Sequence, residues 1–357
     1  MSNPKRRPPI VGRYTQEELA LATRNSGMPL EALRYDVTPA GLHYLLIHFD
    51  IPPADASNWR LRIDGRVAQP RAWSLAELES MPAKTLRVTL ECAGNGRAQT
   101  SPRYPSMPWL EEGVSTAEWT GVPLSALLEQ AGLEAGAREI VFHGTDRGID
   151  RGIEHAFARS LPTVEAARAG VLVAYAMNGQ PLLPQHGAPL RLVVPDWYGM
   201  ASVKWLERIE ATDRAFDGVQ QALSYHFRRD AGAKGVPCTR MRVNSLMVPP
   251  GIPDYYGRRR NLAAGTVEIL GRAWSGDGKI TRVEFSADGR WQDATLDPPA
   301  GPHAWRRWTA RWDAESGTHE LCCRAADETG AIQPLEPVLD VTGFGNNAVQ
   351  RVEVSVR

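Results

Sequence analysis

One cysteine of this chain follows a predicted strand and opens a glycine-rich loop, in the stretch ECAGNGR at residues 91–97. Apolar and polar side chains alternate over residues 86–91 at the two-residue period of a half-buried strand. The glycines let the backbone approach a bulky ligand, and Arg97 can bring a fixed positive charge to an anion beside the sulfur of Cys92. A single cysteine is usually a small buried hydrophobe, but these neighbours favour a site.

Other residues able to bind a ligand or to move a proton follow at intervals. His186 and Arg191 lie in LPQHGAPLRLVVP at 183–195, Lys204 lies in SVKWL at 202–206, and Tyr225 lies in LSYHF at 223–227. Taken singly, such residues are more often surface or core side chains than functional ones. Their assignment therefore depends on the whole set and on the elements that position it.

In the first part of the chain, helix and strand patterns are mixed. Thr15 with Glu18, and Ser74 with Glu77, are capping boxes that open helices. Prolines at 102, 105 and 108 make the approach to Trp109 a stiff extended loop. The predicted elements are a helix from 16 to about 25, a strand at 59–67, a helix ending near 80, the central strand at 86–91, a helix at 122–130 closed by Gly132, a short strand at 139–142, and a strand at 171–177 that turns at Asn178-Gly179 into 181–183.

In the second part, short alternating strands recur between turn signals. Residues 226–239 are rich in glycine and are predicted to be a linker. Strands are predicted beyond it at 243–248, 266–274, 280–286, 305–312, 318–325 and 349–356, with hairpin turns at 276–278 and 287–289. The predicted fold class is α+β: a mixed α/β domain at 1–230 followed by an immunoglobulin-like antiparallel β-sandwich at 240–357.

The composition excludes several classes of protein. The 357 residues include 41 basic and 41 acidic side chains, so no global field attracts nucleic acid or an anionic membrane, and no apolar run reaches the length of a membrane span. The four cysteines form no C-x-x-C pair, which argues against a zinc knuckle and a disulfide framework. Residues 5–9 are basic without an apolar export segment, so a cytoplasmic location is expected, or a periplasmic one if the N-terminus has been trimmed.

Together these motifs resemble the sulfite oxidase family of molybdenum enzymes over most of the chain. The resemblance rests on Cys-Ala-Gly-Asn-x-Arg with Trp109 downstream, on Phe-x-Gly-x-Asp ending at Asp146, and on His-Gly-x-Pro-x-Arg at 186–191 followed by Val-Lys-Trp-Leu at 203–206. Arg24-Asn25-Ser26 resembles the family's Arg-Asn-His segment. The resemblance implies a molybdopterin (pyranopterin dithiolene) cofactor in the first domain and a two-fold homodimer formed through the second.

The resemblance also implies a role for each matched residue. Cys92 is the expected metal ligand, because a soft thiolate suits a metal that already carries sulfur ligands. The expected substrate-side residues are Arg24, Arg97, Trp109 and Tyr225, with the arginines holding an anion and the tyrosine orienting it or relaying a proton. A buried phosphate tail requires charge-assisted hydrogen bonds. The expected cofactor-binding residues are Thr23, Arg24, Asn25, Ser26, Cys92, Asp146, His186, Arg191, Ser202, Val203 and Lys204.

The favoured function is oxidation of sulfite to sulfate by oxygen-atom transfer, with electrons passing to an external acceptor such as a cytochrome. Gly96 and Thr342 stand where the family commonly carries arginines, so the anion pocket has lost positive charge. Two alternatives follow. A related molybdenum enzyme would act on another oxyanion or oxide, such as nitrate or a sulfoxide, and a non-enzymatic binding module would keep the first domain as a relic. The joint presence of Cys92, Arg191 and Lys204 argues against a relic.

Overall fold

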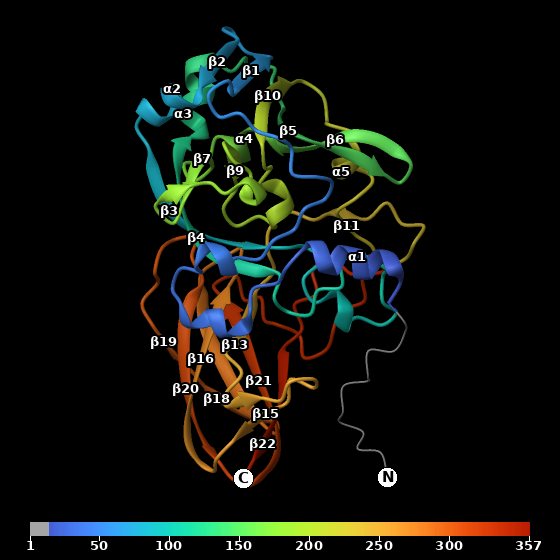
Figure 1. Cartoon of the computed structure of the whole chain (residues 1–357), viewed down its shortest axis with the longest axis vertical. Helices are drawn as coiled ribbons and strands as arrows, with labels where there is room; N and C mark the ends of the chain where they lie inside the picture. Colours follow the sequence, from blue (N-terminus) through green and yellow to red (C-terminus); the bar gives the residue numbers. More distant parts are fainter. Residues whose placement is uncertain (1–13) are drawn as a thin grey trace.

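The computed structural model describes residues 14–357, so the basic segment at 5–9 lies outside the described residues. Its two parts lie end to end: mixed helices and sheets form one end, and long strands of the C-terminal part form the other (Figure 1). Helix α1 (Gln16–Arg24) and part of β4 lie near the junction (Figure 1). Within residues 14–357 no helix is long and apolar enough to cross a membrane.

The first part contains two five-stranded sheets and one short hairpin. One sheet has the order β2-β1-β10-β5-β6, with β1 and β10 parallel and the other pairs antiparallel. The second sheet has the order β3-β4-β7-β8, and β9 also pairs with β7. The strands of the first sheet are β1 (Arg60–Gly65), β2 (Arg71–Ser74), β5 (Glu139–Asp150), β6 (Ile153–Pro162) and β10 (Leu206–Thr212). Those of the second are β3 (Lys84–Glu91), β4 (Val114–Pro123), β7 (Leu172–Met177), β8 (Gln180–Pro181) and β9 (Arg191–Val193).

Local sequence signals account for most of the helix ends and for one tight turn. Both predicted capping boxes form, with Thr15 and Ser74 as the N-caps of α1 and α2. Asn178 and Gly179 have positive φ and join β7 to β8, as an Asn-Gly hairpin requires. The α-helices after α1 are α2 (Leu75–Ser80), α3 (Leu124–Ala131), α4 (Thr163–Ala166) and α5 (Val219–Ala222). Short 3-10 helices lie at Leu30–Arg34, Ala40–Leu42, Arg97–Gln99, Pro184–His186 and Gly199–Ala201.

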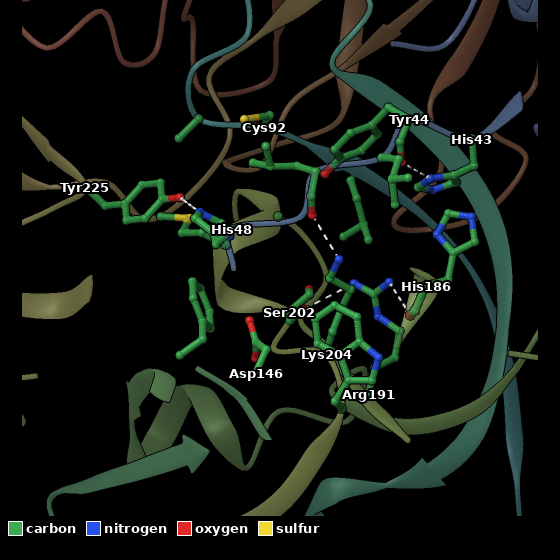
Figure 2. Close-up of a pocket in the computed structure, with 18 residues that line it drawn as sticks. His43, Tyr44, His48, Cys92, Asp146, His186, Arg191, Ser202, Lys204 and Tyr225 are labelled. Atoms are coloured by element: carbon green, nitrogen blue, oxygen red, sulfur yellow. Dashed lines mark hydrogen bonds between the residues drawn. The ribbon is translucent and has the colours of Figure 1, made fainter. Parts of the chain in front are cut away.

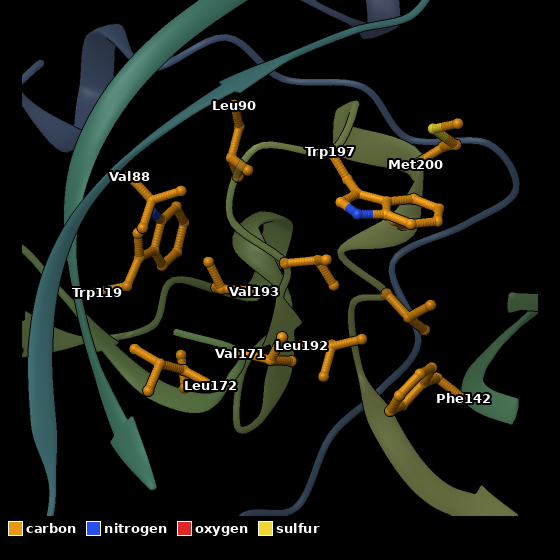
Figure 3. Packing of buried hydrophobic residues seen from close by; sticks show 14 of the residues in the cluster. Val88, Leu90, Trp119, Phe142, Val171, Leu172, Leu192, Val193, Trp197 and Met200 are labelled. Carbon is orange, nitrogen blue, oxygen red and sulfur yellow. The ribbon is translucent and has the colours of Figure 1, made fainter. Parts of the chain in front are cut away.

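A large apolar cluster fixes the strands that carry the candidate site (Figure 3). Val88 on β3 packs near Trp119 on β4, and Leu192 and Val193 on β9 pack near Leu172 on β7 (Figure 3). These side chains are fully or almost fully buried, and each such burial contributes about 1.5 to 3 kcal/mol. The cluster therefore holds the end of β3 and the start of β9, next to Cys92 and at Arg191, in fixed positions.

The second part is a two-sheet sandwich around its own apolar cluster. One sheet has the order β13-β16-β20-β19 and the other β14-β15-β22-β21-β17-β18, with β15 and β22 as a parallel pair. All six predicted strands form, and the strands of two to four residues that the sequence pattern did not predict lie beside them. The bounds are β13 (Asn244–Met247), β14 (Ile252–Pro253), β15 (Arg260–Leu262), β16 (Gly265–Trp274), β17 (Ile280–Ala287), β18 (Arg290–Asp293), β19 (Thr295–Leu296), β20 (Arg306–Ala314), β21 (Gly317–Asp327) and β22 (Gln350–Val356).

Three local predictions are wrong. Strand β5 does not end at Phe142 but runs on to Asp150, because β6 pairs along it across an irregularity between His143 and Arg147. The turn at 276–278 is not a hairpin, since β16 and β17 belong to different sheets. The segment 226–239 is not only a linker, because β11 (His226–Phe227) and β12 (Val236–Pro237) pair within it.

Candidate active site

A cavity with about 660 Å³ of empty space, part of it open to solvent, lies in the first part of the molecule (Figure 2). Its walls come from the segment 43–48, from the end of β3, from β5 and β6, from the stretch 186–205, and from Tyr225. Cys92 and Tyr225 lie toward one side of the cavity, and His186, Arg191 and Lys204 lie toward the other (Figure 2). We call these the sulfur end and the basic end.

Cys92 directly follows β3 and lines the sulfur end. Its backbone N–H donates to the carbonyl of Gly113 at 2.8 Å, which fixes the start of the loop. Burial raises the pKa of the Cys92 thiol, while the nearby Arg97 charge and the Trp109 indole oppose that shift. A β-carbon on Gly94 would lie 2.7 Å from the Arg97 guanidinium, so the glycine permits this close approach.

Arg97 is buried and is held by the backbone of distant segments. Its Nε donates to the carbonyl of Thr342 at 3.2 Å, and its Nη1 donates to that of Met107 at 3.4 Å. Its guanidinium carbon lies 4.8 Å from the centroid of the Phe344 ring. The loop that carries Thr342 and Phe344 belongs to the C-terminal part, so packing between the two parts positions this charge.

Tyr225 reaches the sulfur end from the segment after α5, with a positive φ of 51°. Its hydroxyl lies 2.6 Å from Nε2 of His48, and its ring stacks on Phe344 at a centroid distance of 5.1 Å. Burial, together with the charges of Lys204 and Arg159, lowers the pKa of His48 to about 3, so His48 is neutral at pH 7. Burial raises the pKa of the Tyr225 hydroxyl, so the hydroxyl stays protonated and shares a hydrogen bond with the neutral His48 imidazole.

Arg191 and Lys204 form the basic end. Arg191 donates from Nη1 to the His186 carbonyl at 3.1 Å and from Nη2 to the Ser202 carbonyl at 3.2 Å, and its guanidinium lies 4.6 Å from the centre of a Trp119 ring. Lys204 Nζ donates to the carbonyl of Leu46 at 2.9 Å. Neither cation forms a salt bridge with a carboxylate among residues 14–357. Uncompensated buried cations of this kind favour an anionic ligand.

Burial has a strong effect on the protonation of the basic end. Burial and the Arg191 charge lower the pKa of Lys204 to about 7, and burial with the same arginine lowers the pKa of His186 to about 4. Burial lowers the pKa of Arg191 to about 10, which still leaves it charged at pH 7. A bound phosphate would favour the charged form of Lys204 and offset its desolvation.

The remaining residues predicted to bind the cofactor lie at different depths. Asp146 and Ser202 line the cavity, and Asp146 Oδ1 is buried without a hydrogen-bond partner. Ser202 Oγ accepts from the Val194 N–H at 3.0 Å, which leaves its hydroxyl proton available. Val203 is buried in the apolar cluster, and Trp109 is packed edge-on to Tyr44 next to the Cys92 loop, so neither of these side chains lines the cavity.

The placement of Thr23, Arg24, Asn25 and Ser26 at the cavity is corrected by the structure, because none of the four lines it. The Arg24 side chain is 45% exposed, and its Nη2 donates to the Phe49 carbonyl at 2.6 Å. Asn25 Oδ1 accepts from the Ile47 N–H, so this segment braces the neighbouring cavity wall. The sequence match at residues 23–26 depended on a capping box and an Arg-Asn pair, which are local features. Whether a residue reaches the cavity depends on the tertiary fold.

Sequence reasoning missed several residues at or beside the cavity. His48 lines the cavity directly after Leu46 and Ile47, and the signal that could have found it is an isolated histidine at the end of an apolar run. His43 also lines the cavity, with Nε2 buried and without a partner and its ring 5.3 Å from that of His186. Nothing local in the sequence singles out Phe344, which reaches Tyr225 from the other part of the molecule.

Comparison with known proteins identifies the class of this chain. Residues 48–220 match the model of the oxidoreductase molybdopterin binding domain, and residues 237–357 match that of the Mo-co oxidoreductase dimerisation domain. The sulfite oxidase of Macaca fascicularis is 33% identical and the NADH nitrate reductase of Solanum lycopersicum 30% identical, each over 93% of this chain. The chain spans 64% of the first relative and 40% of the second.

A solved structure shows the same fold over the full length. The sulfane dehydrogenase SoxCD of Paracoccus pantotrophus matches with a TM-score of 0.80 and 26% identity, covering 100% of this chain and 95% of that one. This chain belongs to the sulfite oxidase family of molybdopterin-dependent oxidoreductases. The predicted fold class, a mixed α/β domain followed by a β-sandwich, is confirmed.

The residues of the cavity fit the molybdopterin cofactor of this family. The sulfur end offers one thiolate, and no group of three or more His, Cys, Asp or Glu residues within 14–357 could hold a metal ion by itself. A metal that brings its own sulfur ligands needs only such a single protein ligand. At the basic end, the side chains of Arg191 and Lys204 and the unpartnered His43 nitrogen suit a phosphate tail. Asp146 suits the polar groups of the cofactor that would lie between the two ends.

Proposed function

We propose that this protein oxidises sulfite to sulfate and passes the electrons to an external acceptor such as a cytochrome. The observation that carries the proposal is the sulfur end of the cavity, which Cys92 and Tyr225 line, with the buried Arg97 charge close to the Cys92 sulfur but outside the lining. Sulfite is a small anion with a nucleophilic sulfur, and a cation in a water-poor site stabilises such a group strongly. Sulfite oxidases among the relatives support the choice.

Each residue contributes a separate part of the proposed reaction. The bound cofactor supplies the oxygen-atom transfer and accepts two electrons. Cys92 fixes the metal at the sulfur end, while Arg191 and Lys204 hold the phosphate tail at the basic end. Tyr225, with its hydroxyl hydrogen-bonded to His48, presents a fixed dipole to the substrate. The aromatic wall of Tyr225 and Phe344 excludes water from the side facing the C-terminal part.

Steady-state assays test the proposal. The purified protein should contain molybdenum and should reduce cytochrome c in the presence of sulfite. Nitrate consumption with a reduced dye, combined with no sulfite activity, would assign the protein to the nitrate-reducing branch of its relatives instead. A protein that is purified without molybdenum and cannot take up the cofactor would instead support the non-enzymatic binding module.

Oxidation of a sulfane sulfur is the second candidate. The full-length match to a sulfane dehydrogenase favours it, as does the uncharged Thr342 beside Arg97, which leaves the substrate side less basic. Parallel assays with sulfite and with a persulfide or thiosulfate substrate decide between the two. Turnover of the sulfane substrate with little sulfite turnover would select the second candidate.

We also propose that the C-terminal part mediates a two-fold homodimer. The match of residues 237–357 to a dimerisation domain supports this assembly. Light scattering on the full chain should give twice the mass of the 39.3 kDa monomer. A monomer mass at micromolar concentration would contradict the proposal.

A further inference from the structure

Arg159 is a buried cation next to the cavity, and the proposed function gives it no role. It lies on β6 two residues after Phe157, which lines the cavity, so the two side chains point to the same face of the strand. Only 2% of Arg159 is exposed. Its charge contributes to the lowered pKa of His48, which places it near the Tyr225 side of the cavity.

The surroundings of Arg159 leave much of its charge uncompensated. Its Nη1 donates to the carbonyl of Gln220, and its guanidinium carbon lies 5.5 Å from the centroid of the Tyr225 ring. Its Nε is buried and has no hydrogen-bond partner, and within residues 14–357 no carboxylate forms a salt bridge with it. The other ionisable groups that sense it are Tyr225, His48 and the thiol of Cys238.

Two other arginines of this chain are compensated by a carboxylate. Arg168 and Arg240 are less buried, and both pair with Glu165. A buried cation without such a partner costs several kcal/mol unless another negative group faces it. The Tyr225 ring and one carbonyl offset part of this cost. On the far side of the Tyr225 and Phe344 stack lies the second buried cation, Arg97, so two positive charges flank this pair of rings.

We propose that Arg159 is a specificity-determining residue whose positive charge, acting through the wall formed by Tyr225, holds a sulfur oxyanion at the sulfur end of the cavity. It compensates for the uncharged Thr342 beside Arg97. The inference rests on the proposed function, because it names the charge class of the substrate. It also gives a role to a buried cation that forms no ion pair among the described residues.

The test measures anion binding separately from turnover. Calorimetric titration of the molybdenum-loaded protein with sulfate, the product of the proposed reaction, gives the anion affinity without catalysis. In R159Q the sulfate dissociation constant should rise by about tenfold or more, because a charge several ångströms from an anion in a buried site contributes that much. The KM for sulfite should rise similarly, with kcat within about twofold. R159K should restore most of the affinity, since it keeps the charge.

Matched controls separate a field effect from a structural one. Arg311 is exposed on β20 in the sandwich, so R311Q removes the same charge far from the cavity and should leave sulfate binding unchanged. Dimethyl sulfone, an uncharged molecule of similar shape, should bind the unmodified protein far more weakly than sulfate. This comparison needs no variant and still applies if R159Q does not fold.

Three results would overturn the inference. The first is unchanged sulfate affinity in a folded, loaded R159Q, and the second is equal affinity of the unmodified protein for sulfate and dimethyl sulfone. A loss of kcat in both R159Q and R159K at constant KM would also contradict it, because that pattern indicates a structural role. If the unmodified protein binds sulfate through Arg159 but does not oxidise sulfite, the proposed function fails while this inference stands.

Discussion

The basic end of the cavity is formed mostly by one short stretch of the chain, whereas the sulfur end is formed by segments that are far apart in the sequence. His186, Arg191 and Lys204 come from one stretch, in which backbone carbonyls of the same stretch accept the guanidinium hydrogen bonds. The sulfur end brings together Cys92 and Tyr225 from the first part with Phe344 from the second. The basic end is thus built mostly within one stretch, with added contacts to Leu46 and Trp119 of the same part, whereas the sulfur end depends on the packing of the two parts.

This difference predicts how the two ends respond to substitution. Changes at the basic end should lower the amount of bound cofactor and leave each loaded molecule active. Changes at the sulfur end should leave the cofactor bound and lower the rate or the substrate affinity. Measuring molybdenum content and kcat per molybdenum for each variant separates these responses, and a mixed response would show that the two ends are not independent.

The largest effect is expected for Cys92→Ser. The hydroxyl is a much poorer ligand than a soft thiolate, so turnover should fall by at least about 100-fold, while the fold and much of the pterin remain. Activity assays and pterin fluorescence measure the two quantities. C238S changes another buried cysteine that does not line the cavity and serves as the control. Full activity in Cys92→Ser would remove the metal-ligand assignment.

The next effect is expected at the basic end, in R191A. Loss of charge-assisted hydrogen bonds worth about 1.5 to 3 kcal/mol each should weaken cofactor binding by roughly 10- to 100-fold. Molybdenum content should fall, with kcat per molybdenum nearly unchanged. K84A removes an exposed cation at the start of β3 and should retain normal loading. Wild-type loading of R191A would contradict its role in holding the phosphate.

A positioning effect is expected at the sulfur end, in H48F. Without the hydrogen bond from its hydroxyl to His48, Tyr225 should lose its fixed orientation, and kcat should fall by roughly 10- to 100-fold, as for other outer partners of reactive groups. Molybdenum content should stay within the range of the unmodified protein. If H48F instead loses its molybdenum and keeps its kcat per metal, His48 belongs with the basic end.

The basic end should also make the stability of the cofactor-free protein depend on pH. The pKa of Lys204 is lowered from 10.5 to about 7 in the folded chain, so between these values the unfolded chain binds more protons. The free energy of unfolding should therefore rise as the pH increases from about 7 to about 10.5. Denaturant titrations of the cofactor-free protein and of K204M measure this rise, which should be smaller in K204M. Equal slopes would show that Lys204 is not desolvated.

The smallest effect is expected for F344L, at the contact between the two parts. A stacked aromatic pair contributes about 0.5 to 1.5 kcal/mol beyond its buried area, so KM should change by only a few-fold. Loading and the overall fold should be retained. No change in KM would show that the C-terminal part does not shape the sulfur end.

The same difference between the two ends decided what could be predicted from the sequence. The capping boxes at Thr15 and Ser74 and the turn at Asn178-Gly179 are local, and all three form as predicted. His186, Arg191 and Lys204 lie in one motif and meet at one end of the cavity. Their roles in holding the cofactor stay predictions until they are measured.

Positions that depend on long-range packing could not be predicted in this way. The resemblance placed Arg24 at the substrate, whereas the structure brings His48 to the cavity and leaves Arg24 half exposed at the end of α1. Arg159 and Phe344 have no motif around them, because their positions follow from the pairing of β5 with β6 and from the contact between the two parts. A single sequence contains no local signal for such contacts.

X-ray absorption at the molybdenum edge, compared between the loaded protein and Cys92→Ser, tests whether Cys92 binds the metal. We expect one sulfur ligand fewer around the metal in the variant, with the sulfur ligands supplied by the cofactor unchanged. Identical sulfur coordination in the two proteins would show that Cys92 does not bind the metal.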